Sequence, residues 1–244
     1  MPREFKAGCQ RPNVKKDIEV KETQTEEKQI IKEEIDLIKV GQPAPDFTLP
    51  AYHNGKFVEL SLSEFKGKWV LLCFYPGDFT FVWATEVSAV ADRYKELQEL
   101  GVEVISISVD SVFVHKMWND YELLKMVDGG IPFPMGSDQD GSIGKKYGIY
   151  DENGGVETRG RFIIDPDGIV QGFEVLTPSV GRNVSETIRQ IKAFQLVRES
   201  EGTEVTPSGW QPGKKTLKPG PELVGNVWKE WNIKEAYDSA AATE

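Results

Sequence analysis

The hydrophobic pattern of the chain alternates between two kinds of apolar segment. The segments 69–75 and 102–110 are short and rich in β-branched and aromatic residues, and the first is a continuous apolar run, which is typical of buried strands. Between them, the apolar positions of 87–100 recur every three or four residues, which predicts a helix. This alternation predicts an α/β domain with a central mixed β-sheet flanked by helices.

Shorter elements are predicted on either side of this centre. Thr23 and Glu26 have the spacing of a capping box, and an isoleucine stripe follows them, which predicts a helix over 23–38. The Asn54-Gly55 pair indicates a hairpin before a strand at 57–60. The later segments predict a helix over 111–124, a short helix over 141–147, a strand and turn over 158–168, a strand over 169–175 and a helix over 181–196.

These elements divide the chain into three parts. Residues 1–38 form a charged N-terminal tail and helix, residues 39–199 form one domain, and residues 200–244 form a C-terminal arm. We find no internal repeat and no second domain in the pattern.

Composition narrows the classes of partner and cofactor. A formal net charge of −10, without a basic stripe, argues against nucleic acid and against an anionic membrane surface. No apolar run approaches the roughly 18 residues that a membrane span requires, and the polar N-terminus favours a cytoplasmic protein. The two histidines, His53 and His115, and two unlinked cysteines do not suggest a metal site, and no cofactor motif is present.

The stretch 76–86 is the candidate site because it connects a buried strand to the start of a helix. The first N–H groups of a helix have no partner within the helix, and the helix dipole favours negative charge there. A thiolate at such a position is stabilised and reactive.

This stretch resembles the active-site signature of the peroxiredoxins, Pro-x-x-x-Thr-x-x-Cys. Pro76 and Thr80 match the signature, and Trp83 stands at the position of the peroxidatic cysteine. Further segments resemble those of the typical two-cysteine, alkyl hydroperoxide reductase type, namely 40–50, 110–118, 158–168 and 205–213. In the last of these, Thr206 stands at the position of the resolving cysteine. The resemblance covers about residues 38–226 and implies a thioredoxin-like fold with an N-terminal helical extension and a C-terminal arm.

The resemblance also implies roles for individual residues. In the family a thiolate attacks the peroxide O–O bond and becomes a sulfenic acid. By matching positions, Thr80 orients the peroxide, Arg159 stabilises the developing charge, and Pro76 shields the site. Glu86 and Arg182 match the pair that steers Arg159. Ala84 departs from the usual proline, and His115 matches a residue of the structural scaffold.

The resemblance leaves the chain without a nucleophile at either expected position, because indole carries no ionisable thiol and Thr206 cannot resolve a sulfenic acid. Cys73 lies within a buried strand, where burial raises the pKa of a thiol, so it is no substitute. Cys9 lies in the charged tail.

Three interpretations follow. In the first, the protein lacks peroxidase activity and has a structural or assembly role, as a homodimer formed by edge-strand pairing and a decameric ring in which Trp83 locks the site loop.

In the second interpretation, the sequence is a substituted or mis-decoded form of an active peroxidase. Some family members carry selenocysteine, encoded by UGA, and reading UGA as tryptophan would produce Trp83; a deliberate substitution would look the same. With cysteine or selenocysteine at position 83, the partners would be a hydroperoxide and a thioredoxin-like reductant. Ala84 and Thr206 are not explained by misreading of one codon.

In the third interpretation, Cys9 tethers a partner through a mixed disulfide.

Overall fold

The computed structural model describes residues 38–237, so Cys9 and nearly all of the helix predicted over 23–38 lie outside the described residues. The chain forms two compact units, Met1–Arg182 and Asn183–Glu244, which are described separately below. The domain boundary that the sequence placed at residue 199 stays a prediction.

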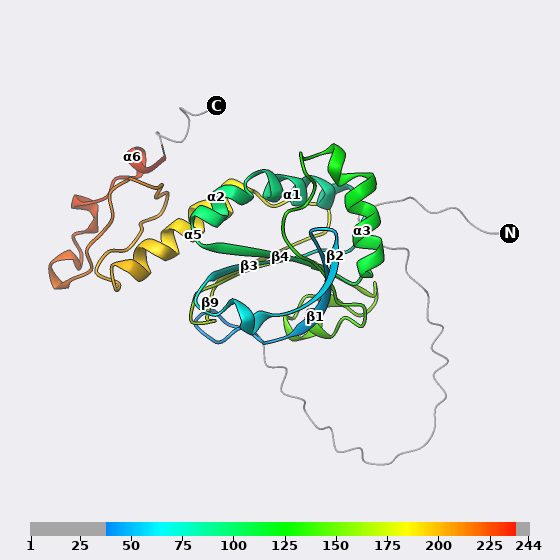
Figure 1. The fold of residues 1–244 in the computed structure, drawn as a ribbon. Coiled ribbons are helices and arrows are strands. Elements are labelled where there is room, and N and C mark those ends of the chain that lie inside the picture. The colour runs from blue at the N-terminus through cyan, green and yellow to red at the C-terminus, as the bar shows by residue number, and fades with distance from the viewer. Residues whose placement is uncertain (1–37, 238–244) are drawn as a thin grey trace, which may run out of the picture. The chain divides into compact units, whose positions relative to one another are not determined.

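The first unit is built on a seven-stranded mixed sheet with the order β2-β1-β5-β4-β3-β8-β9 (Figure 1). The strand at its centre, β3 (Trp69–Phe74), pairs in parallel with β4 and antiparallel with β8. The other strands are β1 (Thr48–His53), β2 (Lys56–Ser61), β4 (Val102–Ser108), β5 (Met135–Ser137), β8 (Arg159–Ile164) and β9 (Val170–Leu176). The hairpin expected at Asn54-Gly55 joins β1 and β2.

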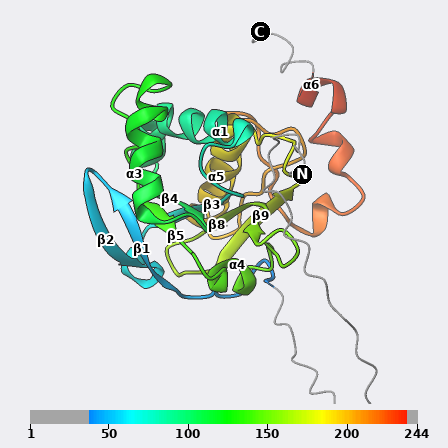
Figure 2. The same cartoon turned by 90° about the vertical axis from the view of Figure 1, so that its right-hand side faces the viewer.

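Helices lie on both sides of this sheet. Helices α1 (Phe81–Asp92) and α2 (Tyr94–Glu99) run along one face (Figure 1), and α4 (Ser142–Lys146) lies on the side of the sheet opposite α1 (Figure 2). Helix α3 (Val112–Tyr121) packs against β1 and β5, and short 3₁₀ helices occupy Leu62–Phe65 and Leu123–Lys125. The mixed sheet with flanking helices confirms the predicted fold class.

The β3 strand is buried on both faces, as its continuous apolar run predicts. Val70, Leu72 and Phe74 point into a core cluster that also contains Ile143 of α4. The side chains between them alternate to the other face, as the two-residue period of a strand requires. Because Cys73 is directly opposite Arg161 in the register, both lie on this second face.

The structure differs from the sequence-based prediction in the helix expected over 87–100. It begins earlier, at Phe81, because Thr80 has an extended backbone (φ −88°, ψ 140°) and serves as its N-cap. It is also interrupted at Arg93 (φ −96°, ψ 7°), so that α1 and α2 are separate helices. The two-residue strands β6 (Tyr150–Asp151) and β7 (Val156–Glu157) were missed, because two residues are too few to show a period.

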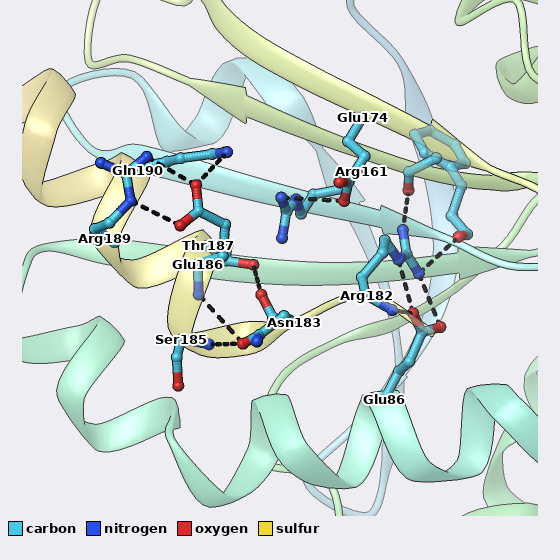
Figure 3. Close-up of polar contacts among 12 residues, drawn as sticks. Glu86, Arg161, Glu174, Arg182, Asn183, Ser185, Glu186, Thr187, Arg189 and Gln190 are labelled. Carbon is cyan, nitrogen blue, oxygen red and sulfur yellow. Dashed lines mark hydrogen bonds and ion pairs between the residues drawn. The ribbon is translucent and has the colours of Figure 1, made fainter. Parts of the chain in front are cut away.

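The second unit begins with α5 (Val184–Glu199), the final helix expected from the sequence. Asn183 caps it: its side-chain oxygen accepts from the backbone N–H groups of Ser185 and Glu186 (Figure 3). In the arm that follows, Val205 and Leu217 exchange two backbone hydrogen bonds of 2.9 Å. Short helical turns occupy Pro221–Leu223 and Val227–Lys229, followed by α6 (Ile233–Tyr237).

Candidate active site

The turn between β3 and α1 presents residue 83 to the interior of the first unit. Pro76 is buried, and the Thr80 hydroxyl donates a 2.7 Å hydrogen bond to the Gly77 carbonyl, which closes the turn. Trp83 is therefore in the first turn of α1, which begins earlier than the helix predicted over 87–100. A side chain at this position lies beside the orphan N–H groups of the helix start.

The indole of Trp83 fills the space at this position and is only 1% exposed. One ring face stacks on Tyr75, with the ring centroids 4.4 Å apart and the planes 13° from parallel. The guanidinium carbon of Arg182 lies 5.1 Å from the Trp83 ring centroid, within the range of a cation–π contact. The indole is thus packed against an aromatic ring and a charged group.

Three charged residues that are far apart in the sequence meet beside Trp83. The Glu86 carboxylate, on α1, accepts a 2.6 Å bond from Arg159 Nη1. It also accepts from the Arg182 backbone N–H at 2.5 Å and from Arg182 Nε at 3.0 Å (Figure 3). Arg182 Nη1 donates in turn to the Gly160 carbonyl at 2.7 Å. Such charge-assisted bonds are strong when buried, so Glu86 fixes the position of both guanidinium groups.

The close approach of Arg182 to α1 depends on the preceding glycine. A Cβ atom at Gly181 would lie 3.3 Å from Val82 Cγ1 and 3.8 Å from Glu86 Cγ. The first distance is tighter than ordinary contact, so glycine lets this segment approach α1 without displacing Val82.

Two buried N–H donors at this site have no hydrogen-bond partner. Arg159 is fully buried; its Nε donates to the Pro178 carbonyl at 2.7 Å and its Nη1 to Glu86, but its Nη2 is unpaired. The indole Nε1 of Trp83 is the second unpaired donor. An unsatisfied buried donor costs about 1–3 kcal/mol, so native proteins keep few of them. The site therefore has donor capacity without an acceptor.

A second buried polar network, which the sequence analysis did not find, is hydrogen-bonded to the turn between β3 and α1. The Tyr75 hydroxyl donates to Asp78 Oδ1 at 2.7 Å, and His115 Nδ1 lies 2.7 Å from Asp78 Oδ2. Burial by itself lowers the pKa of His115, but the Asp78 carboxylate outweighs it and raises that pKa. Burial raises the pKa of Asp78. The sequence assigned His115 to the scaffold, which agrees with this position; its partner in the turn had no sequence signal.

The remaining candidates from the sequence are Cys73 and Thr206. Cys73 is the free cysteine of the described residues, and burial raises the pKa of its thiol to about 11, so it is a poor nucleophile. Thr206 belongs to the second unit, half-buried after the bridge at Val205. Across residues 38–237, no group of three or more His, Cys, Asp or Glu side chains is arranged to hold a metal ion. No helix in the same range is long and apolar enough to cross a bilayer.

In a comparison with known proteins, two segments of the chain match models of protein families. Residues 40–173 match the AhpC/TSA family, and residues 193–230 match the C-terminal domain of 1-Cys peroxiredoxin. The selenocysteine-containing peroxiredoxin PrxU of Peptoclostridium acidaminophilum is 69% identical over 202 residues, covering 83% of this chain and 100% of the relative. Alkyl hydroperoxide reductase C of Bacillus subtilis is 40% identical, over 77% of this chain and 98% of its own.

Solved structures agree with the fold described above. The reduced 2-Cys peroxiredoxin of Plasmodium vivax superimposes with a TM-score of 0.71 and 38% identity, covering 75% of this chain and 94% of its own. AhpC of Enterococcus faecalis gives a TM-score of 0.65 and 39% identity, covering 69% and 98%. The expected thioredoxin-like fold is confirmed, and the chain belongs to the peroxiredoxins of the AhpC/TSA family.

Proposed function

We propose that this chain is the scaffold of a hydroperoxide-reducing peroxiredoxin whose nucleophile, selenocysteine or cysteine, belongs at position 83, and that the Trp83 form is inert. The observation that carries the proposal is the pair of unpaired buried donors, Arg159 Nη2 and Trp83 Nε1. The Arg159 guanidinium is held in place by Glu86 and by a backbone carbonyl, yet one of its nitrogens has nothing to bind. A selenolate or thiolate, or the oxygen of a peroxide, is the acceptor that such a donor fits.

With a nucleophile at residue 83, the surrounding groups have defined tasks. The selenolate or thiolate attacks one peroxide oxygen, so a Se–O or S–O bond forms while the O–O bond breaks. The leaving alkoxide or hydroxide takes a proton. Two thiols of an external dithiol then reduce the selenenic or sulfenic acid, giving a disulfide and water. Arg159 stabilises the charge that develops on the oxygens, Thr80 orients the peroxide, and Pro76 shields the nucleophile.

Glu86 and Arg182 act through Arg159 in this scheme. The carboxylate binds both guanidinium groups, so neither can rotate away as charge builds on the peroxide. Donors that are already in place need no reorganisation during the reaction, which is how fixed dipoles accelerate it.

Trp83 cannot take part in this chemistry, because its indole is a hydrogen-bond donor only and has no electron pair of comparable nucleophilicity. The relative that is 69% identical is named for its selenocysteine, which favours a UGA codon at position 83 that is translated as selenocysteine rather than tryptophan. Ala84 and Thr206 are separate changes that a single codon does not explain. Thr206, at the resolving position, is the reason the scheme uses an external dithiol.

Two measurements test the proposal. Codon 83 of the gene is UGA if the residue is selenocysteine, whereas UGG excludes that origin. Purified protein and its Trp83→Cys form are given hydrogen peroxide or an alkyl hydroperoxide with excess dithiol, and peroxide consumption is followed; Trp83→Ser, small but without a nucleophile, is the matched control. We expect turnover only with Cys at position 83. Turnover by the Trp83 form, or none by Trp83→Cys, contradicts the proposal.

A second candidate function, assembly, has its own observation. Strand β9 is an edge of the seven-stranded sheet, and its outward residues Phe173 and Val175 are exposed. An edge strand of this kind is a template for pairing with a second copy. We propose a homodimer through β9 and a decameric ring of such dimers. Light scattering of the Trp83 and Trp83→Cys forms tests this: a monomer in both contradicts it. The cytoplasmic location and the Cys9 tether stay predictions.

A further inference from the structure

An apolar cleft lies at the opposite end of β3 from the candidate site. It has a volume of about 370 Å³, and Val70, which lines it, is near the start of β3, whereas the candidate site follows the end of that strand. We call it the base cleft. Most of the residues that line it are apolar: Leu62, Val70 and Ile164 are buried, and Ala44, Phe65 and Ile169 are half-buried.

The carboxylates of the base cleft already have partners within the chain. Asp165 is buried and accepts from N–H groups close by in the chain, at distances between 2.8 and 3.0 Å. Asp46 Oδ1 accepts from two backbone N–H groups, at 2.9 and 3.1 Å. A pocket for a polar ligand directs a few polar groups at it, but within residues 38–237 no buried unpaired side-chain atom belongs to a residue of this cleft. The cleft therefore fits apolar side chains better than a polar ligand.

The described part of the chain begins beside this cleft. The Gly41 N–H donates to the Val170 carbonyl at 2.8 Å, and the Ala44 N–H donates to the Gly168 carbonyl at 2.9 Å, which fixes the segment 41–44 at the cleft. Ile38 is half-buried and packs against the core cluster that contains the three buried residues of the cleft. The chain before Ile38 therefore enters next to an apolar surface that the described residues do not cover.

The segment before Ile38 has the apolar pattern that this surface requires. Ile31, Ile35 and Ile38 are four and three positions apart, so they share one side of the helix predicted over 23–38. With a rise of about 1.5 Å per residue, such a helix places Ile31 about 10 Å from Ile38 along its axis. The isoleucines are thus close enough to one another to enter one cleft together.

The charges of this segment complement those around the cleft. Lys28 and Lys32 are four positions apart and border the isoleucine side of the predicted helix. The exposed charged residues that line the base cleft are Asp46 and Asp167, together with one lysine, Lys66. Exposed ion pairs contribute little free energy, so these charges orient the segment while the apolar contacts hold it.

We propose that residues 23–37 form an amphipathic helix that docks, with its isoleucine side inward, in the base cleft of its own chain. Because the segment is attached at Ile38, its effective concentration at the cleft is on the order of millimolar. This concentration favours the segment over a second copy of the chain or a separate protein. The inference does not depend on the chemistry proposed for residue 83.

Limited trypsin digestion of the full chain tests the docking, because proteolysis follows the population of the open segment. Lys28 lies inside the proposed helix, and Lys15, which lies outside it, is the internal control. We expect cleavage after Lys28 to be about tenfold slower than after Lys15. Cleavage at equal rates after the two lysines would overturn the proposal.

Variants of the segment identify the side of the helix that docks. The double variant Ile31→Ala/Ile35→Ala removes the apolar contacts, and alanine preserves the helix. Glu33→Ala, on the opposite side, is the matched control. We expect cleavage after Lys28 to become about tenfold faster in the double variant and to stay at the parent rate in the control. Equal acceleration in both would contradict docking through the isoleucines.

Variants of the cleft identify where the segment docks. Ala44→Lys fills the base cleft, and Ser63→Arg adds bulk at an exposed residue that lines it, so the second variant is informative even if the first does not fold. Ala89→Lys, at an exposed position of α1, is the control. We expect faster cleavage after Lys28 in the folded cleft variants only, with folding checked by circular dichroism. Parent-like protection in Ser63→Arg and in folded Ala44→Lys would place the segment elsewhere and overturn the proposal.

Dilution identifies the occupant of the cleft. Protection by docking within one chain is independent of protein concentration, whereas protection by a second copy decreases on dilution. We therefore expect the same cleavage rate after Lys28 over a hundredfold range of protein concentration, at a fixed concentration of trypsin. Loss of protection on dilution would assign the cleft to a second copy and contradict docking in the same chain.

Discussion

The ring of Trp83 lies face to face with that of Tyr75 at a centroid distance of 4.4 Å, so residue 83 is connected through Tyr75 to the buried network of the turn. Tyr75 therefore has two contacts that matter: its ring supports residue 83, and its hydroxyl binds Asp78. A change at either end of this connection is expected to affect the other.

Replacing Trp83 separates the value of its packing from the cost of its unpaired N–H. Trp83→Ala removes a fully buried ring and is expected to lower the free energy of unfolding by about 3–5 kcal/mol. Trp83→Phe keeps a ring against Tyr75 and removes the unpaired donor, so its stability is expected to stay within about 1 kcal/mol of the parent. Urea denaturation measures both; equal losses in the two variants would contradict this account.

Glu86→Gln is expected to lower the free energy of unfolding by about 3–5 kcal/mol, because it leaves two buried guanidinium groups without their carboxylate. The matched control is Glu103→Gln, which breaks a pair with the mostly exposed Lys68 and is expected to cost less than about 1 kcal/mol. In the Trp83→Cys background, Glu86→Gln should also reduce turnover. If Glu86→Gln lowers the free energy of unfolding as little as Glu103→Gln does, Glu86 does not hold the two arginines in place.

Glu157 gives the fold a pH dependence of definite sign. Its side chain is buried with both oxygens unpaired, and burial, followed by the nearby Asp138, raises its pKa well above the ordinary value. The folded protein keeps this proton while the unfolded chain loses it near pH 4.3. The contribution of Glu157 to the free energy of unfolding is therefore fully present below that pH. It falls as the pH rises towards the folded-state pKa, by up to about 1.4 kcal/mol per pH unit.

The variant Glu157→Gln does not titrate and should lose less stability than the parent between pH 5 and pH 8. Denaturation curves at the two pH values measure this, with the exposed Glu152→Gln as control. Parallel losses in parent and Glu157→Gln would show that Glu157 is ionised in the folded protein.

In the second unit, Asn183→Ala is expected to destabilise α5 by about 1 kcal/mol, because it removes the acceptor for the N–H groups of Ser185 and Glu186. Asn183→Ser retains a capping oxygen, so it is expected to destabilise α5 by only a few tenths of the amount expected for Asn183→Ala. Thermal unfolding followed by circular dichroism compares the three proteins. A serine variant as unstable as the alanine variant would assign the effect to something other than the cap.

The sequence predicted the centre of the fold because the relevant signals are local. The run 69–75 is apolar throughout and became β3, and the Pro76 turn leads into α1 as expected. The structure also brings Glu86, Arg159 and Arg182 together, although they are 73 and 96 positions apart. That grouping came from the family resemblance and not from periodicity, because no local pattern records which distant strand or loop ends beside a helix.

What could not be predicted depends on packing between elements. His115 on α3 is an ordinary helical histidine in the sequence, and only the approach of α3 to the turn gives it Asp78 as a partner. Likewise, Glu157 is in a two-residue strand without a period, so neither its burial nor its nearness to Asp138 had a signal. The predicted helix divides at Arg93, and an arginine, unlike a proline or a glycine, does not mark a break in the sequence.

The turn also contains a residue in a costly conformation. Phe79 has φ 57°, in the left-handed region, which costs a non-glycine residue roughly 1–2 kcal/mol. The hydrogen bonds of Asp78 and Thr80 on either side hold Phe79 in this conformation. When those bonds are lost, Phe79 is expected to return to a relaxed backbone angle in a single step. The turn is therefore expected to switch between two discrete conformations, and not to become more mobile gradually.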